Sequence, residues 1–253
     1  MAVESEGAGH SPLAQFEIKP LIPFRVGEFD LSFTNSALFM VIAVVLATGF
    51  LMLGTRRGAL VPGRWQSVAE LSYEFIANMI RDNVGQEGRK YFPFIFTLFM
   101  FVFFGNMLGM MPYSFTYTSH IIVTFGMAAA VFVGVTVIGF MKHGIRFLGF
   151  LLPSGIPIYM APLIIPIEIL SYFTRPVSLA LRLFANMTAG HTMLKVFASF
   201  VLPMGSAFFI VGGVIPFALI AALTGLELII AFLQAYVFTI LTCVYLNDAL
   251  HMH

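Results

Sequence analysis

Charged residues are scarce in this sequence. Asp, Glu, Lys and Arg make up only 10% of the 253 residues, whereas a soluble domain carries about 25%. This scarcity argues against a water-soluble enzyme. The formal net charge of +1 gives no reason to expect a nucleic-acid partner, and the single cysteine, Cys243, excludes an intrachain disulfide. We also expect no cofactor and no bound metal ion.

A removable signal peptide is not expected, because residues 1–30 are polar and the first apolar run begins near Phe33. Apolar bulk is what the sequence has in abundance. Hydrophobic residues account for 59% of the chain, with 29 Phe and 22 Gly, and the mean hydropathy is +0.95. Large apolar side chains with frequent glycine are typical of helices packed in a bilayer. We therefore expect an all-α integral membrane protein.

The apolar runs predict about five transmembrane helices. A bilayer core of roughly 30 Å needs about 20 residues of helix, and runs of that length lie near 33–54, 91–113 and 119–141. Two runs of about twice that length lie near 160–202 and 206–248. A helix of 40 residues is ~60 Å long, so each long run must be strongly tilted or broken.

Two arrangements of the long runs fit the sequence. We favour two long, steeply tilted helices that form a hairpin. In the alternative, breaks near Pro176 and Pro216 divide them into four shorter spans, because proline removes a backbone hydrogen bond from a helix.

Residues near 64–84, between the first two spans, have the spacing of an amphipathic helix. We expect this helix to lie on or dip into the membrane interface, anchored by Trp65; an ordinary solvated hairpin helix is the alternative. The apolar positions of the pattern are Val68, Leu71, Phe75, Ile76, Met79 and Ile80.

The distribution of Lys and Arg predicts the orientation, because cytoplasmic loops collect these residues. Residues 1–32 contain five acidic and two basic residues, so we expect a polar extracytoplasmic segment there, followed by a single membrane domain over residues 33–253. Five spans then place the C-terminus in the cytoplasm. The basic residues beside the expected cytoplasmic ends are Arg56, Arg57, Arg64, Arg81, Arg89, Lys90, Lys142 and Arg146.

The two long runs contain ionisable residues deep within apolar sequence. A charge at the bilayer centre costs roughly 2.5 to 3.5 kcal/mol on insertion scales, so such residues are candidates for a functional site. These residues are Glu168, Arg175, Arg182, His191, Lys195 and Glu227.

Three of them share one face of a helix. Glu168, Arg175 and Arg182 are seven residues apart, a spacing that returns to nearly the same face. Asn186 and Ser178 lie four residues on either side of Arg182 and extend this stripe. Arginine stays protonated at physiological pH, so the role of Arg182 must be electrostatic. A fixed positive charge blocks cation leakage and attracts a partner's carboxylate.

His191 and Glu227 can titrate and are candidate proton-relay groups. His191 lies about half a turn out of phase with Arg182 and ~13 Å along the helix toward the outside, whereas Glu168 lies on the cytoplasmic side. Glu227 and Gln234 are seven residues apart and share a face of the last run. Two proton paths, offset about an arginine barrier, follow from this order.

Structural interpretations compete with these roles. Arg175 and Lys195 lie nearer the ends of their run and could extend their heads to the lipid headgroups. Glu168 could pair with Arg175 or cap local backbone. His191 could be a buried residue with satisfied hydrogen bonds, and Gln234 could serve as a hydrogen-bonding link between helices.

The run from Ser171 to His191, SYFTRPVSLALRLFANMTAGH, resembles the signature of the F-type ATP synthase subunit a family. Glu168 before this run and the segment from Glu227 to Tyr236 add to the resemblance. Weaker similarity covers residues 62–66 and 106–112, so the resemblance extends over residues 31–253 and is closest to alphaproteobacterial or mitochondrial-like members.

The resemblance implies a stator subunit against which a ring of c subunits rotates, each carrying a carboxylate that binds and releases a proton. Arg182 matches the family's essential arginine, which separates two half-channels. The implied partners are the c-ring, b-type peripheral stalk subunits, the rest of the ATP synthase, membrane lipid and protons. The implied location is the bacterial inner membrane, and the subunit has no nucleotide-hydrolysing site of its own.

The resemblance also assigns the relay residues. His191 and Glu227 match the polar pair of the outer half-channel, with Asn186 and Gln234 nearby, and Glu168 matches the acid near the cytoplasmic half-channel. Some bacterial relatives have Glu at the first position of the pair and His at the second. The exchange seen here keeps one carboxyl and one imidazole. Either H⁺ or Na⁺ as the coupling ion is compatible with these residues.

Two other functions are weighed against this interpretation. A secondary transporter or ion channel would also bury charges near the membrane midplane, but it predicts inverted repeats, and the two halves of this sequence show no convincing repeat. A passive membrane anchor predicts that removal of the buried charges leaves ion flux unchanged.

Overall fold

The computed structural model describes residues 17–26, 29–30, 32–56, 61–111, 114–144, 147, 149, 160–207 and 209–251. This part of the chain is almost entirely helical, and five of its helices are long and apolar enough to cross a membrane. The prediction of an all-α integral membrane protein is thereby confirmed. The α-helices are α1 (Asn35–Thr55), α2 (Arg64–Val84), α3 (Phe92–Gly109), α4 (Ile121–His143), α5 (Ala161–Ala207) and α6 (Phe209–Leu250).

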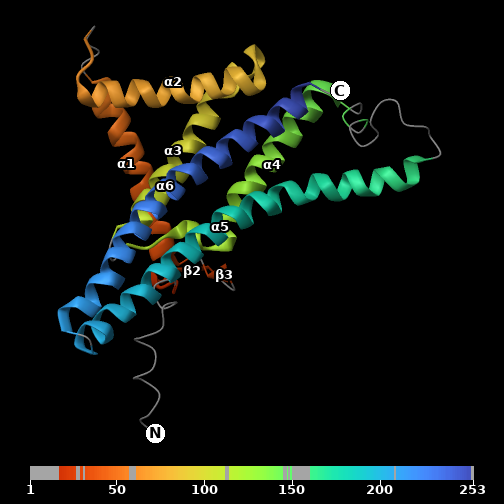
Figure 1. The fold of residues 1–253 in the computed structure, drawn as a ribbon. Helices are drawn as coiled ribbons and strands as arrows, with labels where there is room; N and C mark the ends of the chain where they lie inside the picture. The colour runs from red at the N-terminus through yellow and green to blue at the C-terminus, as the bar shows by residue number, and fades with distance from the viewer. Residues whose placement is uncertain are drawn as a thin grey trace.

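The two long runs each form one continuous helix. α5 has 47 residues and α6 has 42, and both continue through Pro176 and Pro216, so the alternative of four shorter spans is wrong. Proline is tolerated inside membrane helices because neighbouring helices and local adjustments satisfy the freed backbone groups. At ~1.5 Å per residue both helices exceed the bilayer thickness and must tilt. They form the long hairpin in Figure 1.

The hairpin opens toward one end of the molecule. α5 and α6 lie side by side where α5 ends and α6 begins and then diverge, and α4 lies between the separated arms (Figure 1). α4 packs against both long helices, and α3 packs against α6. Within the described chain, α3 and α4 therefore cover part of the hairpin surface.

α2 lies across the end of the bundle at which α1 ends and α3 begins (Figure 1). Its side chains Ala69, Ile76, Met79 and Ile80 are buried. Val68 and Leu71, which the apolar spacing includes, are instead exposed, as is Trp65. The helix therefore packs by one narrow stripe and leaves apolar side chains uncovered, as an interfacial helix requires.

The described residues of the N-terminal segment, to which the sequence analysis assigns no structure, include four short strands. β1 (Pro20–Ile22) pairs with β4 (Phe33–Thr34), and β2 (Arg25–Val26) pairs with β3 (Phe29–Asp30), both antiparallel. β4 leads directly into α1, where the Thr34 hydroxyl accepts a hydrogen bond from the backbone N–H of Ala37. This is a helix N-cap.

The connection between α3 and α4 folds into the bundle. It contains the 3₁₀ helix η4 (Tyr117–Ser119), and a second 3₁₀ helix, η3 (Gln86–Tyr91), precedes α3. Tyr117 is fully buried, and its hydroxyl donates to the Phe101 carbonyl at 2.9 Å. Gly105 of α3 makes room for its ring, because a Cβ at this position would overlap the phenol. This inward fold brings the loop against α5.

Candidate functional site

The structure brings together two of the predicted site residues, His191 of α5 and Glu227 of α6. His191 Nδ1 lies 2.7 Å from Glu227 Oε1, with 12% and 5% of the two side chains exposed. Gly190 allows this approach, since a Cβ at Gly190 would lie 2.6 Å from Glu227 Oε1. The two residues are far apart in the sequence and meet because the hairpin aligns them.

The other ring nitrogen of His191 faces the connection between α3 and α4. His191 Nε2 lies 2.8 Å from the Gly109 carbonyl oxygen and 3.1 Å from the Thr116 hydroxyl. A carbonyl only accepts hydrogen bonds, so Nε2 must carry a hydrogen. Nδ1 then shares one proton with Glu227, as an imidazolium beside a carboxylate or as a neutral imidazole beside a carboxylic acid. This pair can receive a proton on one side and release one on the other.

The α3–α4 connection contributes further polar groups on the side of α5 that His191 faces. The Thr188 hydroxyl of α5 donates to the Ser119 carbonyl at 3.2 Å, and Thr116 and Thr118 are buried. His120 stacks on Phe115 with ring centroids 5.0 Å apart, and burial lowers the pKa of His120, which favours its neutral form. Hydroxyls and a neutral imidazole can both donate and accept hydrogen bonds.

Arg182 points away from this enclosed region. Its side chain is exposed, and within the described residues it makes neither an ion pair nor a hydrogen bond. Its neighbours on the same helical face, Ser178, Ala185 and Ala189, are small and also exposed. Small residues allow another helix to approach closely in a membrane, so this face can bring an external group to the guanidinium.

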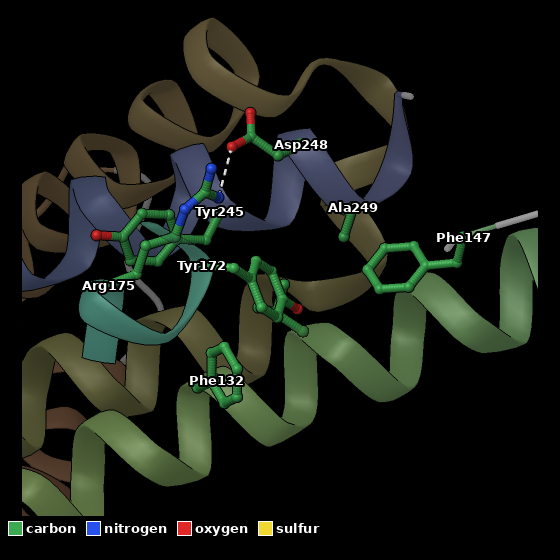
Figure 2. A pocket seen from close by; sticks show the side chains of 8 residues that line it. Phe132, Phe147, Tyr172, Arg175, Tyr245, Asp248 and Ala249 are labelled. Carbon is green, nitrogen blue, oxygen red and sulfur yellow. Dashed lines mark hydrogen bonds and ion pairs between the residues drawn. The ribbon is translucent and has the colours of Figure 1, made fainter. Parts of the chain in front are cut away.

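Arg175 has a partner that the sequence analysis did not assign. Its Nη1 lies 2.8 Å from Asp248 Oδ2 of α6, with 21% and 35% of the two side chains exposed. The ring centroids of Tyr172 and Tyr245 lie 5.7 and 5.2 Å from Arg175 Cζ. Figure 2 shows these side chains gathered around the guanidinium. The interpretation in which Arg175 pairs with Glu168 is therefore wrong, and Arg175 is held within the helix bundle.

The remaining predicted residues are not gathered into one cluster. Glu168 is half-buried near the start of α5, and the described residues offer it no ion-pair partner. Asn186 and Gln234 are half-buried, and Ser178 and Lys195 are exposed. In the described part of the chain, no group of three His, Cys, Asp or Glu side chains could hold a metal ion.

Sequence reasoning missed several groups that shape the site. Asn106 is fully buried and donates from Nδ2 to the Ala231 carbonyl of α6 at 3.1 Å, which is a hydrogen-bonding link between helices of the kind considered for Gln234. Thr116 and the Gly109 carbonyl orient His191. The sequence did contain a signal for Asn106, since it is an amide in an apolar run without charges. Nothing in the sequence pointed to a backbone carbonyl.

Comparison with known proteins identifies similar chains. The family model described as "ATP synthase A chain" matches residues 37–247. The protein named ATP synthase subunit a from Paramagnetospirillum magneticum is 63% identical, over 96% of this chain and 99% of that relative. The proteins of the same name from Rhodospirillum rubrum and Parvibaculum lavamentivorans are 60% and 57% identical, covering 96% and 98% of this chain and 100% and 97% of theirs.

Proposed function

Because the chain belongs to the F-type ATP synthase subunit a family, we propose that it is the proton-conducting stator of the membrane sector. In this proposal two offset half-channels meet at Arg182, which faces the carboxylates of a rotating c-ring and couples proton flow to ATP synthesis. The observation that carries the proposal is an exposed arginine, without a partner in the described chain, on a face of small residues in a membrane helix.

Arg182 acts as a fixed charge. Its guanidinium cannot release a proton at physiological pH, so protons do not pass through it. A charge in hydrocarbon is costly without a counter-charge, and a ring carboxylate arriving on this face supplies one. The carboxylate is held ionised as it passes, which obliges it to release its proton on one side and take up a new one on the other.

His191 and Glu227 form the relay of the outer half-channel. The pair shares one proton, and its Nε2 contact with Gly109 and Thr116 orients the imidazole. We assign the buried hydroxyls of Thr116 and Thr118, in the α3–α4 connection, to the same polar path. Asn186 and Gln234, half-buried on the two long helices, lie along the way to the ring.

Glu168 serves the cytoplasmic half-channel. It precedes Arg182 by fourteen residues, or ~21 Å along a helix, and it lies on the opposite side of Arg182 from His191. The distribution of Lys and Arg puts the N-terminus outside and the C-terminus in the cytoplasm of a bacterial inner membrane. The exposed apolar face of α2 then lies at the cytoplasmic surface, where peripheral stalk subunits of the b type approach the membrane.

The proposal is tested with membrane vesicles that contain the whole ATP synthase with Arg182→Ala. ATP-driven proton pumping is measured per assembled complex and compared with wild type and with Lys195→Ala, which removes an exposed cation elsewhere on α5. We expect pumping to be lost in Arg182→Ala and retained in Lys195→Ala. Undiminished pumping by an assembled Arg182→Ala complex would refute the proposal.

A further inference from the structure

A second ionic contact joins α5 and α6, between Arg175 and Asp248 (Figure 2). We call this group of side chains the arginine clamp. It consists of Tyr172 and Arg175 of α5 and Tyr245 and Asp248 of α6, which converge in Figure 2. Their contacts hold the guanidinium by one ion pair and two aromatic faces. Such a guanidinium is much less free to move than one that faces lipid.

The arginine clamp is also attached to α4. The Tyr172 hydroxyl lies 2.7 Å from the Thr136 hydroxyl, and the Tyr172 and Phe132 rings are 4.8 Å apart between centroids. His143, at the end of α4, contacts the Leu250 carbonyl through Nε2 at 3.2 Å, which fixes the end of α6 beside Asp248. Three helices therefore determine where the Arg175 charge is placed.

Arg175 and Arg182 would otherwise compete for the same partner. They are seven residues apart, on nearly the same face of α5 and ~10 Å from each other along the axis. The Tyr245 phenol lies within electrostatic range of both arginines and of Asp248. Of the two arginines, only Arg175 has a carboxylate partner within the described chain, although both have the same charge and reach.

We propose, on the basis of the proposed function, that Asp248 neutralises and pins Arg175 so that Arg182 alone is open to the ring carboxylate. Asp248 is thus a positioning residue rather than a catalytic one, because it acts through Arg175. Without it, the flexible Arg175 side chain would offer a second cation two turns away, and a ring carboxylate could be held out of register with the half-channels.

The test uses the whole ATP synthase in membrane vesicles with Asp248→Asn, Asp248→Glu and the double variant Arg175→Gln/Asp248→Asn. Protons pumped per ATP hydrolysed are measured, together with the amount of assembled complex. We expect a several-fold loss of coupling in Asp248→Asn and near wild-type coupling in Asp248→Glu. We also expect the double variant to regain most of the coupling, because it removes the released cation as well as its counter-charge.

A purely mechanical clamp predicts a different result, since the double variant also lacks the ion pair and would be impaired as much as Asp248→Asn. That result, or wild-type coupling in Asp248→Asn, overturns the inference. If Asp248→Asn does not assemble, poor coupling in the assembled double variant overturns it equally. Glu87→Gln, which breaks the ion pair with Lys142, is the matched control and is expected to couple normally.

Arg182→Ala is measured in parallel to separate this inference from the proposed function. Loss of pumping in Arg182→Ala with unchanged coupling in Asp248→Asn refutes only the role of Asp248. Retained pumping in an assembled Arg182→Ala complex refutes the proposed function itself.

Discussion

At the scale of single residues, the sequence predicted the chemistry of His191 and Glu227 as proton-relay groups. It did not predict that the two side chains lie in contact. Both stood out as ionisable residues in apolar runs. Their contact depends on the alignment of two long helices and on Gly190, which leaves no side chain between them. A sequence pattern gives the face of a helix but not its alignment with a second helix, so the 2.7 Å contact required the structure.

Removal of the titratable carboxyl tests the relay directly. Glu227→Gln keeps the shape of the side chain but cannot release a proton, so we expect the complex to assemble and ATP-driven pumping to fall strongly. Pumping is measured per assembled complex in membrane vesicles. An assembled Glu227→Gln complex that pumps like wild type would show that protons take a path without Glu227.

The close approach at Gly190 gives a second prediction. In Gly190→Ala, the new Cβ would lie 2.6 Å from Glu227 Oε1, so the carboxyl must move away from His191. Overpacking of this kind costs about 1–3 kcal/mol, and we expect reduced pumping per assembled complex. Gly225→Ala on α6 is the control, because its added Cβ has no neighbour within 4 Å. Equal pumping in the two variants would argue against a tightly set pair.

At the scale of helices and loops, the lengths of the apolar runs predicted the helices well, because hydrocarbon thickness determines how many residues each needs. Their continuity was harder to predict. Pro176 is buried against the bundle, and the packing around it compensates for a hydrogen bond that proline cannot make. The inward fold of the α3–α4 connection was not predicted, since short polar segments without periodicity give no information on direction.

The packing of this connection on α3 can be tested at Gly105. In Gly105→Ala the new Cβ overlaps the ring of Tyr117, so we expect the connection to be displaced and the assembled complex to lose stability by about 1–3 kcal/mol. Thermal inactivation of pumping in purified complexes measures this loss. Gly126→Ala on α4, where a Cβ meets nothing within 4 Å, should leave the inactivation temperature unchanged; equal inactivation of both variants would contradict this packing.

At the scale of the whole molecule, five helices of the described chain are long and apolar enough to cross a membrane, which predicts that the two ends of the chain lie on opposite sides of a bilayer. The charge distribution predicts that the N-terminus is outside. In a Cys243→Ser background, we expect a cysteine at Lys19 to react with a membrane-impermeant maleimide only from the outside, and a cysteine at His251 only from the cytoplasm. The reverse pattern in intact cells and inverted vesicles would contradict the orientation, and with it the assignment of the two half-channels.

The candidate site illustrates which molecular features can be inferred from a sequence. Glu168, Arg175, Arg182, His191 and Glu227 were evident because a charge in hydrocarbon is costly and needs a reason. Asp248 was not evident as a site residue, because it lies next to the polar end of the chain, where a carboxylate is expected in any membrane protein. Its pairing with Arg175 depends on how α5 and α6 pack against α4. This packing is not encoded in a local sequence pattern.

The central claim is that two proton paths meet at Arg182 and are kept apart by its charge. The most direct measurement is the passive proton leak of vesicles carrying the assembled complex with Arg182→Ala, alone and combined with Glu227→Gln. We predict that Arg182→Ala raises the leak, because the two paths become connected, and that the added Glu227→Gln lowers it again by closing the outer path. An unchanged leak in Arg182→Ala, or a raised leak that Glu227→Gln does not reduce, would contradict the account.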